Sequence, residues 1–274
     1  MYRAYYVNEK QMKDFLKDYD EERIYSQAMD TDELEKHLLK MILNEQNSLN
    51  AEDIWDTYFP FITMPVFISH SSKDKSIARK LANFLYENFS IVSFIDSDLW
   101  GNIANLQNII DRYFCDIRSD YEKKQSKKMV YSYELRNEST AHVHMILSYA
   151  LTKMIDTAEC FIFIKSDNSI SVKNSISGTF SPWIFHELAI VDTISMKCPT
   201  RIDLNLQKSI ESSAHLFNES ALKVHYPVPC RKLNYLSCKM LQDWSSNYYL
   251  DGEENMAWEL ALNDLYTLNL EEKK

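Results

Sequence analysis

Three short runs of apolar residues, at positions 66–68, 91–95 and 160–164, most constrain the fold of this chain. Runs of this length, with β-branched and aromatic residues, are typical of buried strands. Between the first two runs, apolar residues recur over residues 78–89 at the 3.6-residue spacing of a helix. A strand, a helix and a strand in this order predict a βαβ unit with parallel strands. The third run predicts another parallel strand, so we expect an α/β protein.

Glycine is scarce in this chain, with only three glycines in 274 residues. They stand far apart, at Gly101, Gly178 and Gly252. The chain therefore contains neither the G-x-G-x-x-G fingerprint of dinucleotide-binding folds nor the G-x-x-x-x-G-K-[ST] loop of nucleoside triphosphatases. These two classes of α/β protein are excluded.

Net charge and cysteine usage narrow the functional classes further. Thirty Lys and Arg against forty Asp and Glu give a formal charge of −10, which argues against an extended nucleic-acid surface. The five cysteines include no C-x-x-C pair, which disfavours a disulfide framework or a zinc site. No signal peptide and no long apolar run is recognisable. We therefore expect a cytoplasmic protein with reduced thiols that binds no membrane, nucleic acid or metal.

The remaining elements are predicted from helix caps, prolines and periodicity. Residues 1–60 are predicted to form a helical N-terminal extension, in which Asn8 and Gln11 have the spacing of an N-cap and its N3 partner. Ser181 followed by Pro182 indicates a helix start, with proline at the first helical position. We also expect a loop at 96–101, a helix at 103–114, a polar insertion at about 116–140, a helix at 143–156, a loop at 166–181, a helix from 182 to about 196, a strand at 222–228, and helices at 236–246 and 254–268.

Ligands of open α/β sheets bind beyond the carboxyl ends of the strands, which directs attention to three segments. In residues 69–74, hydroxyls and amides at a helix start could hold a phosphate, or Ser71 or Ser72 could simply cap the helix. In residues 96–101, the Asp-x-Asp pair fits a turn better than a metal site. Both readings of the first segment stay open at this point.

The third segment, on the helix that starts at Pro182, contains a carboxylate in an unusual place. Glu187 lies within the apolar stripe of this helix rather than opposite it, and Trp183 is one turn earlier on the same face. Such a pair can flank a planar, positively charged heterocycle. The alternative is a boundary glutamate that reaches solvent or pairs with a basic side chain.

Four segments resemble, in chain order, the motifs of the Toll/interleukin-1 receptor (TIR) family. Residues 66–74 (VFISHSSKD) resemble the opening strand and first box, and residues 94–101 (FIDSDLWG) resemble the second strand and BB loop. Residues 161–166 (FIFIKS) resemble the next strand, and residues 183–187 (WIFHE) resemble the W-x-x-x-E segment of NAD-consuming members. The Asp-x-x-Leu-Trp stretch is also similar to the TIR proteins of the bacterial Thoeris anti-phage system.

This resemblance, which covers about residues 64–200, implies a TIR-like (flavodoxin-like) parallel sheet flanked by helices. The domain would span residues 61–274, with an insertion at about 116–140 and C-terminal α/β additions. The insertion, the N-terminal extension and the long C-terminal part have no counterpart in a minimal TIR domain. They put the mode of assembly and the activating trigger in doubt.

The resemblance implies an NAD+ glycohydrolase or cyclase that breaks the nicotinamide–ribose bond, with NAD+ as substrate and no cofactor. It implies that Glu187 is catalytic and that Trp183 stacks on nicotinamide. Water capture would give ADP-ribose, and capture by a group of the same molecule would give a cyclic product. The other substrate-binding residues implied are Ser69, His70, Ser71, Lys73 and Asp74, then Asp96, Asp98, Leu99 and Trp100 on the BB loop, and Ser166 at the end of the third strand.

The resemblance also implies a homo-oligomer formed through TIR–TIR contacts. Its nucleotide product would act on a downstream effector, or NAD would be depleted, in bacterial anti-phage defence. Two alternatives remain open at this point. The chain could be a non-enzymatic TIR scaffold in which Glu187 is structural, or an enzyme like nucleoside deoxyribosyltransferase that exchanges bases on deoxynucleosides.

Overall fold

The computed structural model divides the chain into two compact units. The first combines Met1–Ser26, Thr63–Asp96 and Thr152–Lys274, and the second combines Gln27–Ile62 and Ser97–Leu151. The structure describes residues 1–22, 36, 40, 50–51, 53–54, 64–95, 97, 106–118, 129–173, 176–202, 226–250 and 258–271.

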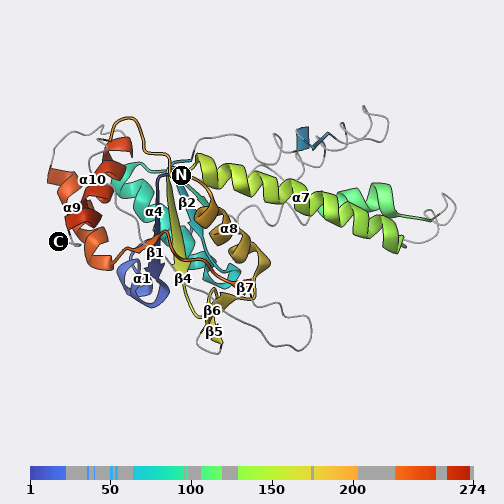
Figure 1. The fold of residues 1–274 in the computed structure, drawn as a ribbon, viewed down its shortest axis with the longest axis horizontal. Coiled ribbons are helices and arrows are strands. Elements are labelled where there is room, and N and C mark those ends of the chain that lie inside the picture. Colours follow the sequence, from blue (N-terminus) through green and yellow to red (C-terminus); the bar gives the residue numbers. More distant parts are fainter. Residues whose placement is uncertain are drawn as a thin grey trace. The chain divides into compact units, whose positions relative to one another are not determined.

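A five-stranded parallel sheet organises the first unit, with helices on both faces (Figure 1). The three runs predicted as parallel strands are confirmed, and they lie side by side with aromatic contacts between Phe67 and both Phe94 and Phe161. The strand order is β3-β2-β4-β1-β8. The strands are β1 (Arg3–Asn8), β2 (Val66–Ser69), β3 (Ser93–Ile95), β4 (Cys160–Lys165) and β8 (Leu233–Tyr235).

The N-terminal strand β1 corrects the sequence prediction, which assigned helix to the whole of residues 1–60. Residues Arg3–Asn8 pair in parallel with β4 on one side and with β8 on the other. Ala4, Tyr5 and Val7 are fully buried there, because a strand inside a sheet is covered on both faces. In the flavodoxin-like strand order, the fourth strand along the chain lies beside the third. In this sheet the N-terminal strand β1 occupies the corresponding position, beside β4.

The predicted helix cap at Asn8 is confirmed, and it marks the change from strand to helix. The Asn8 side chain accepts a hydrogen bond of 3.0 Å from the backbone N–H of Lys10, at the start of α1 (Glu9–Phe15). A cap of this kind satisfies a donor that has no partner within the helix. Most of residues 23–60 lie outside the described residues, so the helical prediction stays untested there.

One face of the sheet is covered by α1, α4 (Lys75–Phe89), α9 (Cys238–Leu250) and α10 (Trp258–Glu271), as Figure 1 shows. The last two confirm the helices predicted near the C-terminus. They belong to the main core, where the fully buried Trp244 stacks on Phe89 with ring centroids 3.8 Å apart. The C-terminal part is therefore integral to the core of the first unit.

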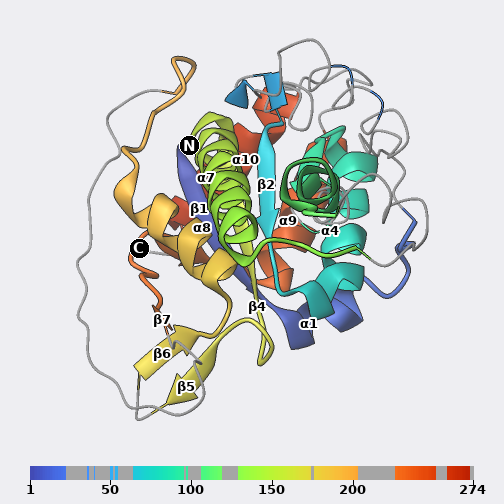
Figure 2. The same ribbon diagram turned by 90° about the vertical axis from the view of Figure 1, so that its right-hand side faces the viewer.

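Helix α8 (Pro182–Thr193) lies on the opposite face of the sheet from α1 and α4 (Figures 1 and 2). Its N-cap is Ser181, as predicted, and the serine hydroxyl accepts from the N–H of Ile184 at 3.3 Å. The helix ends three residues before the predicted position 196. The loop predicted at 166–181 is partly wrong, because it contains β5 (Ser171–Lys173) and β6 (Ile176–Thr179), which pair in an antiparallel sheet with β7 (Tyr226–Pro227).

The described part of the second unit contains residues 106–110 in a helix that continues as the π-helical turn η2 (Asp111–Cys115). Helix α7 (Tyr133–Thr157) begins ten residues before the predicted position 143. The Ser132 hydroxyl accepts from the N–H of Leu135 at this earlier start. Hydrogen bonds to the buried Asp111 support it, since its carboxylate accepts from the buried Ser139 at 2.7 Å and from the exposed Arg136 at 2.9 Å. The predicted polar insertion is therefore partly helical.

The five cysteines are free thiols, and burial raises the pKa of the Cys160 thiol at the start of β4.

Among the described residues, no helix combines the length and the apolar character needed to cross a membrane.

Candidate functional site

Polar side chains gather where β2 and β4 end. The two strands are parallel neighbours, so their carboxyl ends lie at the same edge of the sheet. Strand β2 ends at Ser69, opposite Phe163 of β4, and Ser166 directly follows β4. The connections after these two strands also lead to opposite faces, since α4 follows β2 and α8 follows β4 (Figure 1). Ligand sites of open α/β sheets occur at such positions.

Glu187 is completely buried at this edge, and its carboxylate is held by a serine from β2. The Ser69 hydroxyl donates a 2.5 Å hydrogen bond to Glu187 Oε2, and both residues have an exposed fraction of 0%. The hydrogen bond offsets part of the cost of burying a carboxylate. The neighbouring Ile184, Leu188 and Val191 are also buried, which confirms that Glu187 lies within the apolar stripe of α8.

Trp183 lies one helical turn before Glu187 and is half-buried. Its ring is edge-on to the imidazole of His186, with centroids 6.5 Å apart. His186 was not among the predicted site residues, and its three-residue spacing from Trp183 was the signal that could have indicated it. An aromatic ring that is not closed off in the core can stack on a planar ligand.

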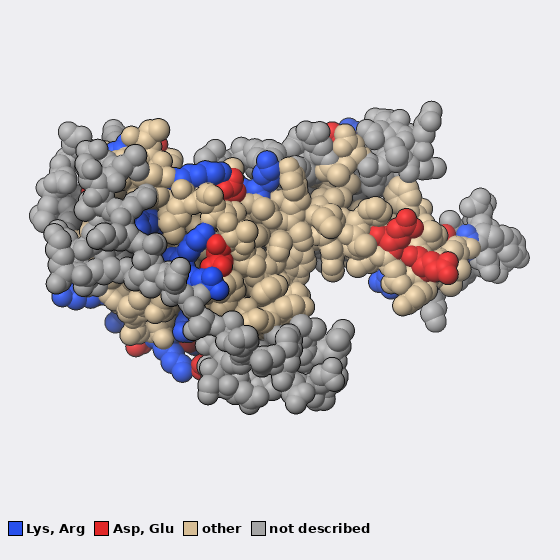
Figure 3. Space-filling view, viewed as in Figure 1, with Lys and Arg blue, Asp and Glu red and all other residues tan. Residues whose placement is uncertain are grey.

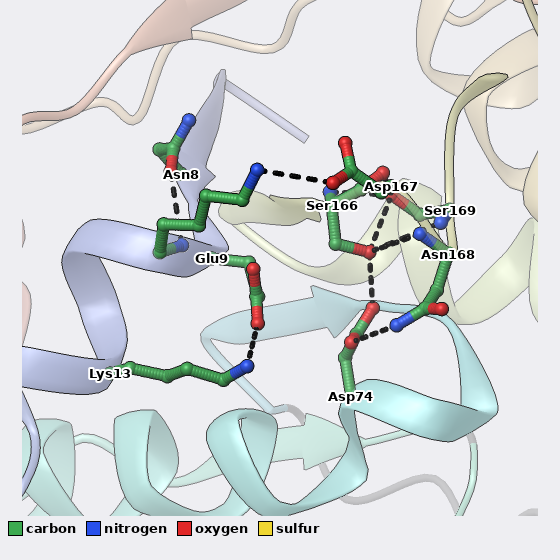
Figure 4. A network of polar contacts seen from close by, with 9 residues as sticks. Asn8, Glu9, Lys13, Asp74, Ser166, Asp167, Asn168 and Ser169 are labelled. Atoms are coloured by element: carbon green, nitrogen blue, oxygen red, sulfur yellow. Dashed lines mark hydrogen bonds and ion pairs between the residues drawn. The ribbon is translucent and has the colours of Figure 1, made fainter.

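A second carboxylate, Asp74, lies at the start of α4 and contacts the turn that follows β4 (Figure 4). The Ser166 hydroxyl donates to Asp74 Oδ2 at 2.5 Å, and Asn168 Nδ2 donates to Asp74 Oδ1 at 2.9 Å. Asp74 and Ser166 were both predicted to belong to the site, and the structure brings them together. Asn168 and the buried Ser169 were missed, because they lay in a segment predicted as an undifferentiated polar loop.

The other residues predicted between Ser69 and Asp74 differ in their exposure. His70 and Ser71 are buried, whereas Lys73 is exposed. The predicted capping of α4 by Ser71 or Ser72 is wrong. A 3-10 turn, η1 (Ser72–Asp74), precedes the helix, and neither its N-cap nor that of α4 makes a side-chain capping bond. The predicted Asp96, Asp98, Leu99 and Trp100 lie outside the described residues.

Lysines also lie at the carboxyl edge of the sheet. Lys10 on α1 forms an ion pair of 3.1 Å with Asp167, and both side chains are largely exposed, so the pair contributes little stability. The Lys165 ammonium, at the end of β4, lies 5.4 Å from the centre of the Tyr6 ring. Where Figure 3 shows described residues, Lys and Arg are scattered among other residues on this face.

The described residues include no group of three or more His, Cys, Asp or Glu side chains arranged to hold a metal ion. What they do provide is a buried carboxylate oriented by a hydroxyl, one turn from a half-buried indole. A fixed carboxylate of this kind stabilises positive charge that develops beside it during a reaction. Comparison with protein-family models, with curated proteins and with solved structures finds no match to this chain.

Proposed function

We propose that this chain is an NAD+ nucleosidase of the TIR type, with glycohydrolase or cyclase activity. The observation that carries the proposal is the buried Ser69–Glu187 hydrogen bond of 2.5 Å at the edge where β2 and β4 end. This bond supports the view that the Glu187 carboxylate is held in place before the substrate binds. The TIR resemblance of residues 66–74 and 183–187, which contain Ser69 and Glu187, supports the assignment of this carboxylate to NAD+ cleavage. Two other parts of the expectation, a homo-oligomer and anti-phage signalling to an effector, rest on the resemblance alone, whereas the expected cytoplasmic setting rests on cysteine usage and the lack of a recognisable signal peptide.

The proposed chemistry breaks the bond between C1′ of the ribose and the ring nitrogen of nicotinamide. The electron pair of that bond moves to the nitrogen, so the cationic pyridinium leaves as neutral nicotinamide. Positive charge then develops on the ribose as an oxocarbenium-like species, which Glu187 would stabilise electrostatically. Water would add to C1′ and lose a proton to give ADP-ribose, or a nucleophile of the same molecule would add and give a cyclic product.

Concentrated protein incubated with NAD+ is expected to release nicotinamide, detected by chromatography with mass detection. The mass of the second product separates ADP-ribose from the cyclic form, which lacks the elements of water. Deoxynucleosides with a free base serve as a second substrate set. Base exchange without NAD+ cleavage would support the deoxyribosyltransferase alternative. Absence of both reactions, in protein shown to be oligomeric, would favour the scaffold alternative.

Replacing Trp183 by Ala is expected to raise KM for NAD+ about 2- to 30-fold, with a smaller effect on kcat. A cation–π contact to the pyridinium contributes about 0.5–2 kcal/mol, and it is already present in the bound ground state. Steady-state kinetics of nicotinamide release measure both constants. Trp183→Phe should restore most of the loss, because a phenyl ring can still stack.

A matched control for this substitution is Phe180→Ala, since Phe180 is an exposed aromatic residue just before the same helix. Its KM and kcat should stay near those of the wild type. Equal effects of Trp183→Ala and Phe180→Ala would argue that Trp183 makes no specific contact with the pyridinium.

A further inference from the structure

Asp74 joins the ends of two neighbouring strands, and we propose that it is a positioning residue for Glu187. In this role Asp74 touches no substrate atom. It holds the turn after β4 against the start of α4 and so fixes the sheet edge at which Glu187 and the ribose meet. The inference rests on the proposed NAD+ cleavage and deepens it, because it assigns a role to a carboxylate that would otherwise be grouped with the substrate contacts.

The first observation is that both oxygens of Asp74 already accept hydrogen bonds from protein donors. Oδ2 accepts from the Ser166 hydroxyl at 2.5 Å, and Oδ1 accepts from Asn168 Nδ2 at 2.9 Å. The exposed fraction of Asp74 is 3%, so these bonds are shielded from water. Asp74 also occupies the N-cap position of α4, where an aspartate commonly caps the helix, yet it makes no side-chain capping bond. Its carboxylate is committed to the turn instead.

The second observation is that the turn after β4 is organised around the same hydroxyl. Ser166 Oγ accepts from the backbone N–H groups of Asn168 and Ser169, each at 3.1 Å. The Ser169 hydroxyl accepts from the N–H of Ser166 at 2.8 Å and donates to the carbonyl of Ile164 in β4. Figure 4 shows Asp74 and this turn facing one another. The Asp74–Ser166 bond therefore fixes the whole turn rather than one side chain.

The third observation is the short connection between Asp74 and the serine that holds Glu187. Ser69 ends β2, and the segment from it to Asp74 contains the buried His70 and Ser71. The Asp74 N–H donates to the carbonyl of Ser71 at 2.7 Å, which closes the turn η1. A shift of Asp74 would pass along this segment to Ser69, and from Ser69 to Glu187 Oε2.

These contacts predict an effect on the orientation of the reacting groups rather than on substrate affinity. Misplacement of a reacting group by about 1 Å can cost on the order of 100-fold in rate. We expect Asp74→Ala to lower kcat about 10- to 100-fold and to change KM by less than about threefold. Asp74→Asn should stay within about threefold of wild-type kcat, because the amide can accept from Ser166 and donate to a turned Asn168 amide.

The test compares Asp74→Ala, Asp74→Asn, Ser166→Ala and the double alanine variant with the full-length wild type. Ser166→Ala removes the same bond from the other side, and it keeps the experiment decisive if Asp74→Ala does not fold. If Asp74 acts through Ser166, the double variant should be no slower than the slower single variant. Asp243→Ala, which removes an exposed aspartate on α9 away from the site, is the matched control and should leave kcat unchanged.

Amide hydrogen exchange supplies a readout that does not depend on activity. Exchange at Asn168 and Ser169 should accelerate in Asp74→Ala and return towards the wild-type rate in Asp74→Asn. The proposal is overturned if Asp74→Asn is as slow as Asp74→Ala, if the loss is in KM, or if the effects of the two alanine substitutions multiply. Wild-type protein that leaves NAD+ intact would overturn the proposed function and the catalytic role of Asp74 together, whereas the exchange rates would still report whether Asp74 fixes the turn.

Discussion

Glu187→Gln is expected to lower kcat for nicotinamide release by about 100- to 1,000-fold, with the fold intact. Removal of one preorganised electrostatic group from an active site has effects of this size. The amide has nearly the same shape as the carboxylate, and its oxygen can still accept from Ser69, but it has no charge to stabilise an oxocarbenium-like ribose. The measurement is the rate of nicotinamide release at saturating NAD+, together with the thermal unfolding midpoint.

The matched control is Glu87→Gln, an exposed glutamate on α4 that removes the same charge away from the site. Its kcat should equal that of the wild type. Wild-type turnover by the Glu187→Gln variant would contradict the catalytic role of Glu187. A Glu187→Gln variant whose unfolding midpoint falls sharply would instead show that the carboxylate is required for folding, and Ser69→Ala would then be used to test the same hydrogen bond.

Trp244→Ala is expected to lower the free energy of unfolding by about 3–5 kcal/mol, a large part of the roughly 5–15 kcal/mol of a typical domain. Trp244 has an exposed fraction of 0%, stacks on Phe89 of α4, and donates through its indole N–H to the carbonyl of Ala261 at 2.8 Å. The substitution removes a large buried ring together with the hydrogen bond from its indole N–H to α10. Urea unfolding followed by circular dichroism measures the change.

The control for this stability prediction is Leu260→Ala, on α10 beside Ala261. Leu260 has an exposed fraction of 44%, so its loss should cost less than about 1 kcal/mol. Equal destabilisation by Trp244→Ala and Leu260→Ala would mean that the α9–α10 pair does not contribute its buried face to the core. Trp244→Phe should fall between the two, since it keeps an aromatic ring but loses the N–H donor.

The parts of the fold that the sequence predicts correctly are those with strong local signals. The apolar runs of β2, β3 and β4 and the Ser181–Pro182 start of α8 depend only on neighbouring residues. Strand β1 is not predicted correctly, because residues 3–7 directly precede the helix cap at Asn8 and the predicted helix includes them. Strand β8 has three residues with a polar one in the middle, so no periodicity marks it.

In the candidate site too, features set by neighbouring residues could be predicted from the sequence, and contacts between distant residues could not. The burial of Glu187 was predictable, because its position within an apolar helical stripe is a property of α8 alone. The contact between Asp74 and Ser166 joins residues 92 positions apart, and nothing near either residue indicates the other. The TIR resemblance placed both residues among the predicted substrate contacts, but nothing in the sequence indicated that they contact each other.

The central place of β1 in the sheet has a consequence for how the protein is made. Its partner residues are distant in the chain, as the hydrogen bond from Asn234 Nδ2 to the Ala4 carbonyl across 230 positions shows. At about 5–20 residues per second, a ribosome needs roughly 10–45 s to reach β8 after it has made β1. During that time β1 has an unpaired edge, which is a template for wrong pairing with another nascent chain. The five-stranded sheet can be completed only after β8 has been made, near the end of synthesis. Its assembly is therefore a late step that depends on contacts between distant residues.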